Sequence, residues 1–414
     1  MYDLTLTPEQ LEFRDTVRDF VTTEVKPAAL DPKRLEPFEK PLLANILEKA
    51  SQMGLRSLAL SEEAGGAGAD GLTSCIVMEE LGAGDVDLAS VLAHTSTLAG
   101  ILFDRLMTPA QRARLLPKFV DDDRYHLAFA GREPGAGVGW SYHRPLPAEA
   151  GAEPTASRQG SDWVINGTLP FVANATVAKL FAVQVRTDPM KSGMNGLSTL
   201  LVPRETAGLT VRDPFRATGD SVRWHHGAGA GISFKDCRVP ADHLLGKESS
   251  SPLALGAELT RGVPQHAAIN LGLGRAAYEA AMDYAKLRRQ GGRNIVEHQA
   301  IGTKLADCAI RLELARNIIW KAAWSLDHPD AAAGGSLDDV PHHVVARVYT
   351  AEAVNEVALL AAECFGAMGV MRDMPLQKYV HDSMVFLHSD DADGAAKLAV
   401  AESIAGYQRP AAAA

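Results

Sequence analysis

The sequence predicts an α+β fold in three lobes, with helices at both ends of the chain and a β domain between them. Apolar residues recur every three or four positions from residue 7 to about 120, at every second position through the middle of the chain, and every three or four again towards the C-terminus. With 414 residues, 46% of them hydrophobic, the chain can bury a core shared by two or three lobes. The expected boundaries are residues 1–122, 123–247 and 248–414.

The first lobe is predicted to be helical throughout. In TPEQLEFRDTVRDF, Gln10 follows Thr7 at the spacing of a capping box, which opens a helix. Similar periodicity around residues 41–53, 72–82, 86–105 and 109–119 predicts four further helices. The stretch SEEAGGAGADG between them is too rich in glycine for a helix and predicts a loop.

The middle and last lobes differ in their hydrophobic period. Stretches such as DWVINGTLPFVA, LFAVQVRT and AGISFKDCRVP alternate apolar and polar residues between turn residues, which predicts strands. Near the C-terminus, AINLGLGRAAYEAAMDYAKLRR and two further stretches predict long helices, and long antiparallel helices form a bundle. The segment DHPDAAAGGSLDDVP predicts a surface connection within this bundle.

Composition limits the functions to consider. A formal charge of −10 without a run of Lys and Arg argues against nucleic acid or an anionic membrane as a partner. The N-terminus lacks the basic and apolar regions of a signal peptide, and no uncharged apolar run approaches the roughly 18 residues of a membrane span, so a cytoplasmic protein is expected. The cysteines are far apart, without a CxxC pair, and are expected to be buried hydrophobes rather than metal ligands: Cys75, Cys237, Cys308 and Cys364.

Seven motifs in order resemble those of the acyl-CoA dehydrogenase superfamily over nearly the whole chain. They are TPEQLEFRDTVRDFV, REPGAG, WVINGTLPFVANA, RVPADHLLG, LGLGRAAYEAAMDYAKLRRQGG, HQAIGTKLAD and FGAMGV. The resemblance implies N-terminal helices, a central β-barrel-like domain and a C-terminal four-helix bundle, assembled as a homotetramer or homodimer. It also implies FAD between the β domain and the bundle, reaching a neighbouring subunit. The implied reaction desaturates an acyl thioester carried by coenzyme A or an acyl carrier protein.

Two segments of the middle lobe match the superfamily's flavin contacts. The stretch YHLAFAG before REPGAG predicts a strand. In REPGAG itself, Gly135 and Gly137 let the backbone approach a bulky ligand, whereas Arg132 and Val138 replace the family's usual Thr and Ser. A plain turn would also explain the glycines. In FVANA, Phe171 matches the aromatic residue that shields the flavin ring. Ala173 stands where the family has a Thr that bonds to flavin N5, so its side chain can donate no hydrogen bond.

The last lobe carries the remaining cofactor matches. Arg288 fits the arginine that reaches the FAD pyrophosphate across a subunit interface, and Gln299 fits another position near the cofactor. Gly366 and Gly369 in CFGAMGV would let helix ends close around the dinucleotide. The competing interpretations are a solvated helix charge for Arg288 and a helix C-cap for the glycines.

The segment HDSMVFLHSDDADG corresponds to the family's base segment. Aligned from Asp382 onward, it puts Asp390 where family members have the glutamate that removes the substrate α proton. The aspartate side chain is one methylene, about 1.5 Å, shorter. The alternative is that Asp390, Asp391 and Asp393 cap the last helix. One branch of the superfamily takes its base from a position near Gly262, where this chain has no carboxylate.

Three functions stay open at this point. The first is an FAD-dependent acyl-thioester dehydrogenase with Asp390 as the base, with either an electron-transfer flavoprotein or O2 as acceptor. The second is a flavin monooxygenase or oxidase on the same scaffold, favoured by Ala173 and by unassigned histidines at His225, His226 and His388. The third is a non-catalytic subunit that stabilises a heteromeric partner, since several flavin contacts are replaced.

Overall fold

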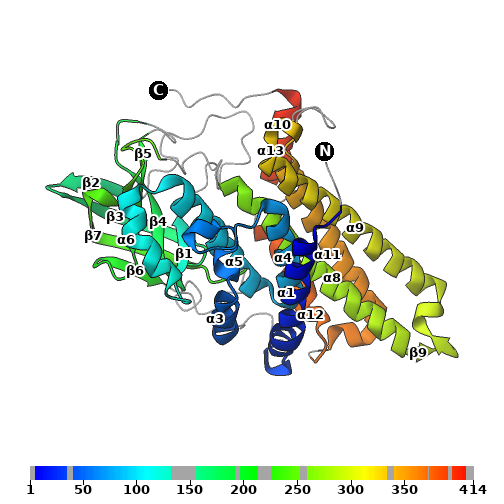
Figure 1. Cartoon of the computed structure of the whole chain (residues 1–414). Helices are drawn as coiled ribbons and strands as arrows, with labels where there is room; N and C mark the ends of the chain where they lie inside the picture. The colour runs from blue at the N-terminus through cyan, green and yellow to red at the C-terminus, as the bar shows by residue number, and fades with distance from the viewer. Residues whose placement is uncertain are drawn as a thin grey trace.

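The computed structural model describes residues 5–34, 41–131, 154–191, 196–212, 225–251, 259–332, 340–371, 373–389 and 394–406. The N-terminal helices lie in the middle of the molecule, between the β sheet on one side and the long C-terminal helices on the other (Figure 1). The predicted α+β order of helices, strands and helices is confirmed.

The first lobe is helical, as the sequence predicts. Thr7 accepts a hydrogen bond from the Gln10 N–H and donates its own N–H to the Gln10 side chain, which is the expected capping box. The elements are α1 (Pro8–Phe20), η1 (Val21–Val25), α2 (Lys26–Ala29), η2 (Pro32–Arg34), α3 (Ala44–Gln52), η3 (Leu55–Ser57), η4 (Glu62–Ala64), α4 (Gly71–Gly84), α5 (Val86–Ala99), η5 (Gly100–Leu106) and α6 (Pro109–Val120). Within the glycine-rich stretch, only the short η4 turn is helical.

The middle lobe is one twisted sheet. Its strands are β1 (His126–Ala130), β2 (Thr155–Gln159), β3 (Asp162–Val172), β4 (Ala178–Arg186), β5 (Leu197–Pro203), β6 (Leu209–Arg212), β7 (Ala230–Pro240) and β8 (Leu244–Leu245), with the turn η6 (Ala241–His243) before β8. The strand order is β6-β7-β3-β2-β4-β5-β8, and β1 pairs with β4 in parallel. Successive residues of β4 belong to two different hydrophobic cores. Phe181 packs with apolar residues of the other strands, whereas Ala182 packs against η5 and α6. The sheet is therefore fixed to the first lobe.

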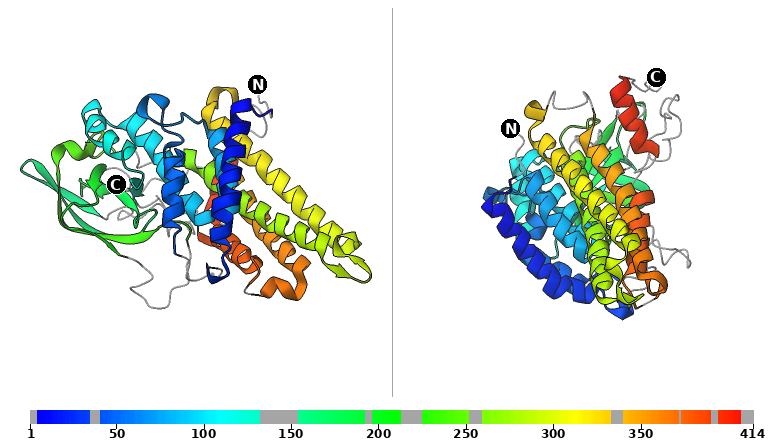
Figure 2. Two further views of the ribbon diagram at one scale, coloured as in Figure 1. Left: turned by 60° about the horizontal axis from the view of Figure 1, so that its bottom comes forward. Right: turned by 90° about the vertical axis from the view of Figure 1, so that its right-hand side faces the viewer.

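Four long helices form the C-terminal bundle and lie side by side in both views of Figure 2. They are α8 (Val263–Leu287), α9 (Gln299–Asp327), α11 (His342–Phe365) and α12 (Leu376–Ser389). Shorter elements join or follow them: η7 (Leu259–Gly262), β9 (Arg289–Gln290), β10 (Arg293–Asn294), η8 (Ile295–Glu297), α10 (Pro329–Ala332), η9 (Gly366–Val370) and α13 (Gly394–Ala405). Gly291 and Gly292 both have positive φ, 60° and 82°, which suits the two-residue turn between β9 and β10.

Two of the described helical stretches are long and apolar enough by composition to cross a membrane, residues 86–106 and 342–370. In the first, 83% of the apolar window is buried inside the protein, and in the second 44% is buried. The second includes α11, which packs against α8, α9 and α12. Both stretches are explained as core helices. All four cysteines are buried and free, as the sequence predicts.

Helices α4 and α8 touch backbone to backbone where they cross. A Cβ atom added at Gly272 would lie 2.1 Å from the carbonyl oxygen of Glu79, and one added at Gly82 would lie 2.2 Å from that of Ile269. Glycine on both helices is therefore what permits this approach, because any side chain would have to push the opposite backbone away. The contact joins the first lobe to the bundle.

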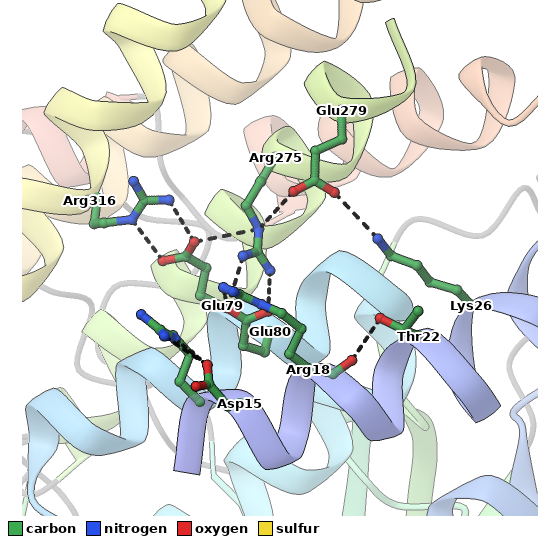
Figure 3. Close-up of polar contacts among 10 residues, drawn as sticks. Asp15, Arg18, Thr22, Lys26, Glu79, Glu80, Arg275, Glu279 and Arg316 are labelled. Atoms are coloured by element: carbon green, nitrogen blue, oxygen red, sulfur yellow. Dashed lines mark hydrogen bonds and ion pairs between the residues drawn. The ribbon is translucent and has the colours of Figure 1, made fainter. Parts of the chain in front are cut away.

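Two adjacent carboxylates of α4 extend this contact to four helices (Figure 3). Arg275 of α8 donates to both oxygens of Glu80, at 2.9 and 2.6 Å. Arg18 of α1 binds the same carboxylate, at 2.6 and 3.2 Å. Arg316 of α9 forms a matching pair with Glu79, at 2.7 and 3.1 Å. Glu79 and Glu80 are only 5% and 3% exposed, so each charge depends on its guanidinium partners.

Burial raises the pKa of the Glu80 carboxyl, but the hydrogen bonds from Arg275 and Arg18 outweigh it and hold the pKa below its usual value. Ionised Glu80 therefore stabilises the folded state above its ordinary pKa of about 4.3, and this contribution is lost as the pH falls through the lower pKa of the folded protein.

Gly272→Ala should destabilise the protein by about 3 kcal/mol, since the new methyl group meets the α4 backbone rather than a movable side chain. Urea unfolding of the variant and the wild type measures this. Gly302→Ala is the matched control, because its Cβ would have only Val296 O nearby, at 3.7 Å, and alanine favours the helix by up to about 1 kcal/mol. Equal unfolding midpoints for Gly272→Ala and wild type would contradict the close contact.

Glu80→Gln should lower the free energy of unfolding by about 3 kcal/mol at neutral pH, because it removes the charged partner of the half-exposed Arg18 and leaves the largely buried Arg275 with only its longer contacts to Glu79 and Glu279. It should also flatten the loss of stability that the wild type shows between about pH 5 and pH 3. Thermal melts across this pH range provide the measurement. Asp15→Asn, which removes an exposed ion pair with Arg14, serves as the control and should follow the wild type. Parallel pH curves for wild type and Glu80→Gln would refute the assignment.

Candidate functional site

The sequence-predicted site residues fall into two groups in space, and five lie outside the described residues. Those five are Arg132, Gly135, Gly137, Val138 and Asp390. The structure describes the chain up to both segments: β1 ends at Ala130 just before the REPGAG loop, and α12 ends at Ser389 just before Asp390. The strand expected before REPGAG is confirmed.

The first group lies at the end of β3, where this strand meets α5 and the loop of residues 225–229. The Phe171 ring packs on the His225 ring, with centroids 4.7 Å apart. Gly229 lies against the same ring, since a Cβ there would be 2.2 Å from a Phe171 ring carbon. Ala173 follows as a half-buried residue whose methyl group offers no hydrogen bond. Phe171 is therefore held by a histidine and a glycine of one loop.

Asn174, which the sequence reasoning missed, fixes this turn. Its backbone has φ of 61°, a left-handed conformation that Asn tolerates better than most residues. The buried side-chain amide donates to Val91 O at 3.0 Å, Thr95 Oγ1 at 3.2 Å and Leu127 O at 3.3 Å. The residue thus ties the end of β3 to α5 and β1. The asparagine inside the FVANA segment was the available signal.

A neutral imidazole continues this network. Thr95 Oγ1 lies 3.3 Å from His126 Nδ1, and because the Thr95 oxygen already accepts from Asn174, its hydroxyl can donate to that nitrogen. Burial, reinforced by the positive charge of Arg56, lowers the pKa of His126 to about 3. His126 is therefore uncharged at neutral pH and supports the segment as a hydrogen-bond acceptor.

Two further histidines, His94 of α5 and His266 of α8, face the same junction. The Phe129 N–H points at His94 Nε2 at 3.4 Å, and the His266 ring packs on Phe386 of α12 with centroids 5.1 Å apart. Burial, with a smaller effect of charge on His266, lowers the pKa of His94 to about 4. His266 lies one helical turn beyond Gly262, so an imidazole rather than a carboxylate occupies this part of α8.

The helix that leads to Asp390 carries a buried ion pair. Lys378 Nζ donates to Asp382 Oδ2 at 2.8 Å, and both residues are 1% exposed. Burial alone would lower the pKa of the Lys378 ammonium, but Asp382 and Asp85 outweigh it and raise this pKa above its usual value. The Lys378 ammonium therefore stays charged at neutral pH, and its attraction to Asp85 links α12 to the first lobe. His388, at the end of the helix, is exposed.

The second group gathers Arg288, Gln299, Gly366 and Gly369 at the far end of the bundle. Arg288 follows α8 and Gln299 opens α9, on either side of the β9–β10 hairpin, and both are exposed. The end of α11 lies beside them, because Phe365 stacks on Tyr284 of α8 at 4.2 Å. Gly369 packs on this helix, where a Cβ would be 2.5 Å from Ala362 O.

The two groups lie at opposite ends of the long helices. The hairpin next to Arg288 is the part of the bundle farthest from the sheet that carries Phe171 (Figures 1 and 2). A ligand bound at one group of this chain therefore does not reach the other group of the same chain.

A polar cleft of about 480 Å³ lies apart from both groups, between the first lobe and the start of α8. Its wall includes Ser74, Thr97, Gln265 and the Arg261–Asp327 ion pair, whose charged atoms are 3.0 Å apart. None of the predicted site residues that the structure describes lines it.

The described residues of the second group suit FAD. Arg288 is exposed and forms no ion pair with a described residue, so its permanent charge is available to a pyrophosphate. A Cβ at Gly366 would meet no atom within 4 Å, which leaves the backbone at the end of α11 open to a large ligand. Among the described residues, no group of three or more metal-ligating side chains is found.

The chain is similar to known proteins along nearly its whole length. Profiles of the acyl-CoA dehydrogenase N-terminal, middle and C-terminal domains match residues 7–123, 147–236 and 253–402. An acyl-CoA dehydrogenase of Bacillus subtilis (strain 168) is 30% identical over 384 residues, which cover 92% of this chain and 93% of that protein.

Solved structures show the same fold. Butyryl-CoA dehydrogenase from Megasphaera elsdenii superposes with a TM-score of 0.80 at 23% identity, over 98% of this chain and 99% of the other. The FAD complex of PigA gives 0.79 at 20% identity, over 98% and 100%. With all three of its domains in order, the chain belongs to the acyl-CoA dehydrogenase family of flavin-dependent oxidoreductases.

Proposed function

We propose that this protein is an FAD-dependent dehydrogenase of an acyl thioester carried by coenzyme A or an acyl carrier protein. The observation that carries the proposal is the meeting of two segments at one junction. The end of β3, with Phe171, and α12, which leads directly to Asp390, both contact the dipeptide His225–His226. A flavin face and a carboxylate base are the two groups that α,β-desaturation requires.

FAD is proposed to bind between two copies of the chain. Phe171, Ala173 and the Arg132–Val138 loop of one copy would hold the isoalloxazine end. Arg288, Gln299, Gly366 and Gly369 of a neighbouring copy would hold the dinucleotide end. The separation of the two groups within one chain supports this arrangement, and it requires a homodimer or homotetramer.

Asp390 is proposed to remove the α proton of the substrate. The α C–H proton passes to its carboxylate, the β hydrogen leaves with its electron pair, and a C=C bond forms between the two carbons. Bound FAD supplies the hydride acceptor. The packing of α12 on α8 and α11 supports this role, because it fixes the helix that ends one residue before Asp390. A shorter base needs such a rigid support, since displacements near 1 Å cost about 100-fold in rate.

A flavin oxidase or monooxygenase is the second candidate, with O2 in place of an electron-transfer flavoprotein as acceptor. Ala173 favours it, because losing a side-chain donor beside the flavin changes the stabilisation of the reduced cofactor. Four imidazoles near the junction, His94, His225, His226 and His266, also favour proton transfer there. Oxygen uptake that rises with thioester turnover would support this alternative.

A colourless protein that does not bind FAD would instead support the third function, a non-catalytic subunit. A cytoplasmic location remains part of the proposal.

Asp390→Asn should leave FAD content unchanged and slow anaerobic bleaching of the flavin by acyl-CoA about 100- to 10,000-fold, the usual effect of removing a general base. Stopped-flow absorbance with straight-chain and branched acyl-CoA measures this rate. Asp393→Asn, a second carboxylate of the same segment, is the matched control and should bleach at the wild-type rate. If Asp390→Asn bleached as fast as wild type, Asp390 would not be the base.

Arg288→Ala should weaken FAD binding about 10-fold or more, because a charge-assisted contact to the pyrophosphate contributes roughly 1.5–3 kcal/mol. Equilibrium titration of the apoprotein with FAD gives the affinity. Arg293→Ala removes another exposed arginine from the same hairpin and should leave the affinity unchanged. Equal losses in both variants would show a general charge effect instead of a specific contact.

A further inference from the structure

The loop of residues 225–229 joins all three lobes. It precedes β7 of the sheet, lies against the N-terminal end of α5, and contacts α12 of the bundle. Its two histidines, His225 and His226, carry no assigned role in the sequence. Here His225 is 5% exposed, and the His226 side chain is 4% exposed. The loop is therefore docked in the core.

His226 makes contacts with two different lobes. Its Nε2 lies 3.1 Å from the carbonyl oxygen of Asp382, and because a carbonyl can only accept, this nitrogen carries the proton and donates. Its Nδ1 lies 3.5 Å from Asp87 Oδ1 of α5. The ring also packs on Phe386 of α12, with centroids 4.2 Å apart. One imidazole therefore spans α5 and α12.

The residues on either side of His226 connect it to α5 and to Phe171. The Gly227 N–H donates to Asp87 Oδ1 at 3.0 Å, which fixes the backbone on the C-terminal side of His226. On the N-terminal side, the His225 ring packs on Phe171, and Gly229 leaves the space that the Phe171 ring occupies. The loop is thus a short rigid connection between the flavin-like segment and the helix that leads to Asp390.

The partners of His226 are themselves fixed. Asp382 pairs with the buried Lys378 four residues before it on α12. Asp85, two residues before Asp87, pairs with Arg34 at 2.9 Å and caps α5 through the N–H groups of Asp87 and Leu88. A shift of α5 at this point would break the buried ion pair of Asp85 with Arg34, which costs about 3–5 kcal/mol. The Lys378–Asp382 pair lies within α12, and its ammonium also faces the negative charge of Asp85 in the first lobe.

We propose that His226 is a positioning residue that sets the separation between the flavin-binding segment of β3 and the base-bearing end of α12. The hydrogen bond from His226 to Asp382 O and that from the Gly227 N–H to Asp87 fix this separation, and Phe386, four residues before Asp390, packs on the His226 ring. The inference rests on the proposed function for its effect on rate. The structural part of the inference is that His226 determines the surroundings of the flavin, and this part does not depend on which reaction the flavin carries out.

His226→Leu should test this directly, because leucine keeps an apolar contact with Phe386 but removes both polar contacts. In the FAD-loaded protein we expect an altered visible circular dichroism spectrum of the flavin, with FAD affinity within about threefold of wild type. With an acyl-CoA that bleaches the wild type, we expect the bleaching rate at saturation to fall about 100-fold, with the half-saturating concentration nearly unchanged. His226→Gln retains an N–H donor for Asp382 O and should recover about tenfold of this loss.

Either of two results for His226→Leu would overturn the inference. The first is a flavin spectrum like that of the wild type together with a bleaching rate within twofold of it. The second is a lower thermal stability with a wild-type bleaching rate per bound flavin. If His226→Leu does not fold, Asp87→Ala decides. It removes the acceptor of the Gly227 N–H and with it the hydrogen bond from the loop to α5, and bleaching unchanged within twofold would then overturn the proposal. His328→Gln, at an exposed histidine at the end of α9, should match the wild type in every measurement.

The two proposals fail in different ways. If no acyl thioester bleaches the wild-type protein, the proposed function fails, but the flavin spectra of wild type and His226→Leu still decide the role of His226. If the wild type bleaches and His226→Leu behaves identically, the proposed function stands and the positioning role fails.

Discussion

The backbone contact between α4 and α8 is the constraint on which the rest of the structure depends. At Gly82 and Gly272 the two helices approach so closely that a single added carbon on either would meet the other backbone at 2.2 or 2.1 Å. Arg275, one turn further along α8, binds Glu80 of α4. Arg18 binds the same carboxylate and so joins α1 to the crossing. Close packing excludes other positions of the two helices. Separating them is also strongly disfavoured, because the buried carboxylates of Glu79 and Glu80 would lose their arginine partners.

The candidate site takes its geometry from this crossing. α5 follows α4 directly, with Asp85 between them as C-cap of one helix and N-cap of the other, so its Val91 carbonyl and Thr95 hydroxyl stand where Asn174 needs acceptors. α12 packs on α8 and α11, with Lys378 and Asp382 buried in the interface. The β sheet reaches both helices through Asn174 and His226. Three lobes of the chain therefore contribute to one junction. Each lobe is held there by buried polar groups that have few other hydrogen-bond partners within reach.

The order of elements could be predicted from the sequence, because it depends on local patterns. The capping box at Thr7, the strand before REPGAG and the long C-terminal helices follow from spacing of three, four or two residues. The α4–α8 contact could not be predicted, since nothing local distinguishes Gly272 from a glycine that merely tolerates a helix. The docking of His226 also depends on tertiary contacts: its partners, Asp87 and Asp382, are distant in sequence. Asn174 was within reach, since Asn is among the few residues that suit a left-handed turn at a strand end. Arg132, Gly135, Gly137, Val138 and Asp390 lie outside the described residues, so their roles stay predictions.

A structure of the assembled protein with FAD and a bound thioester is the most direct test of the proposed site. We expect the isoalloxazine against Phe171 and Ala173 of one copy, the pyrophosphate beside Arg288 of a neighbouring copy, and the substrate α carbon within reach of Asp390. Density for FAD elsewhere, or a substrate α carbon facing a different proton acceptor such as His266, would contradict this arrangement.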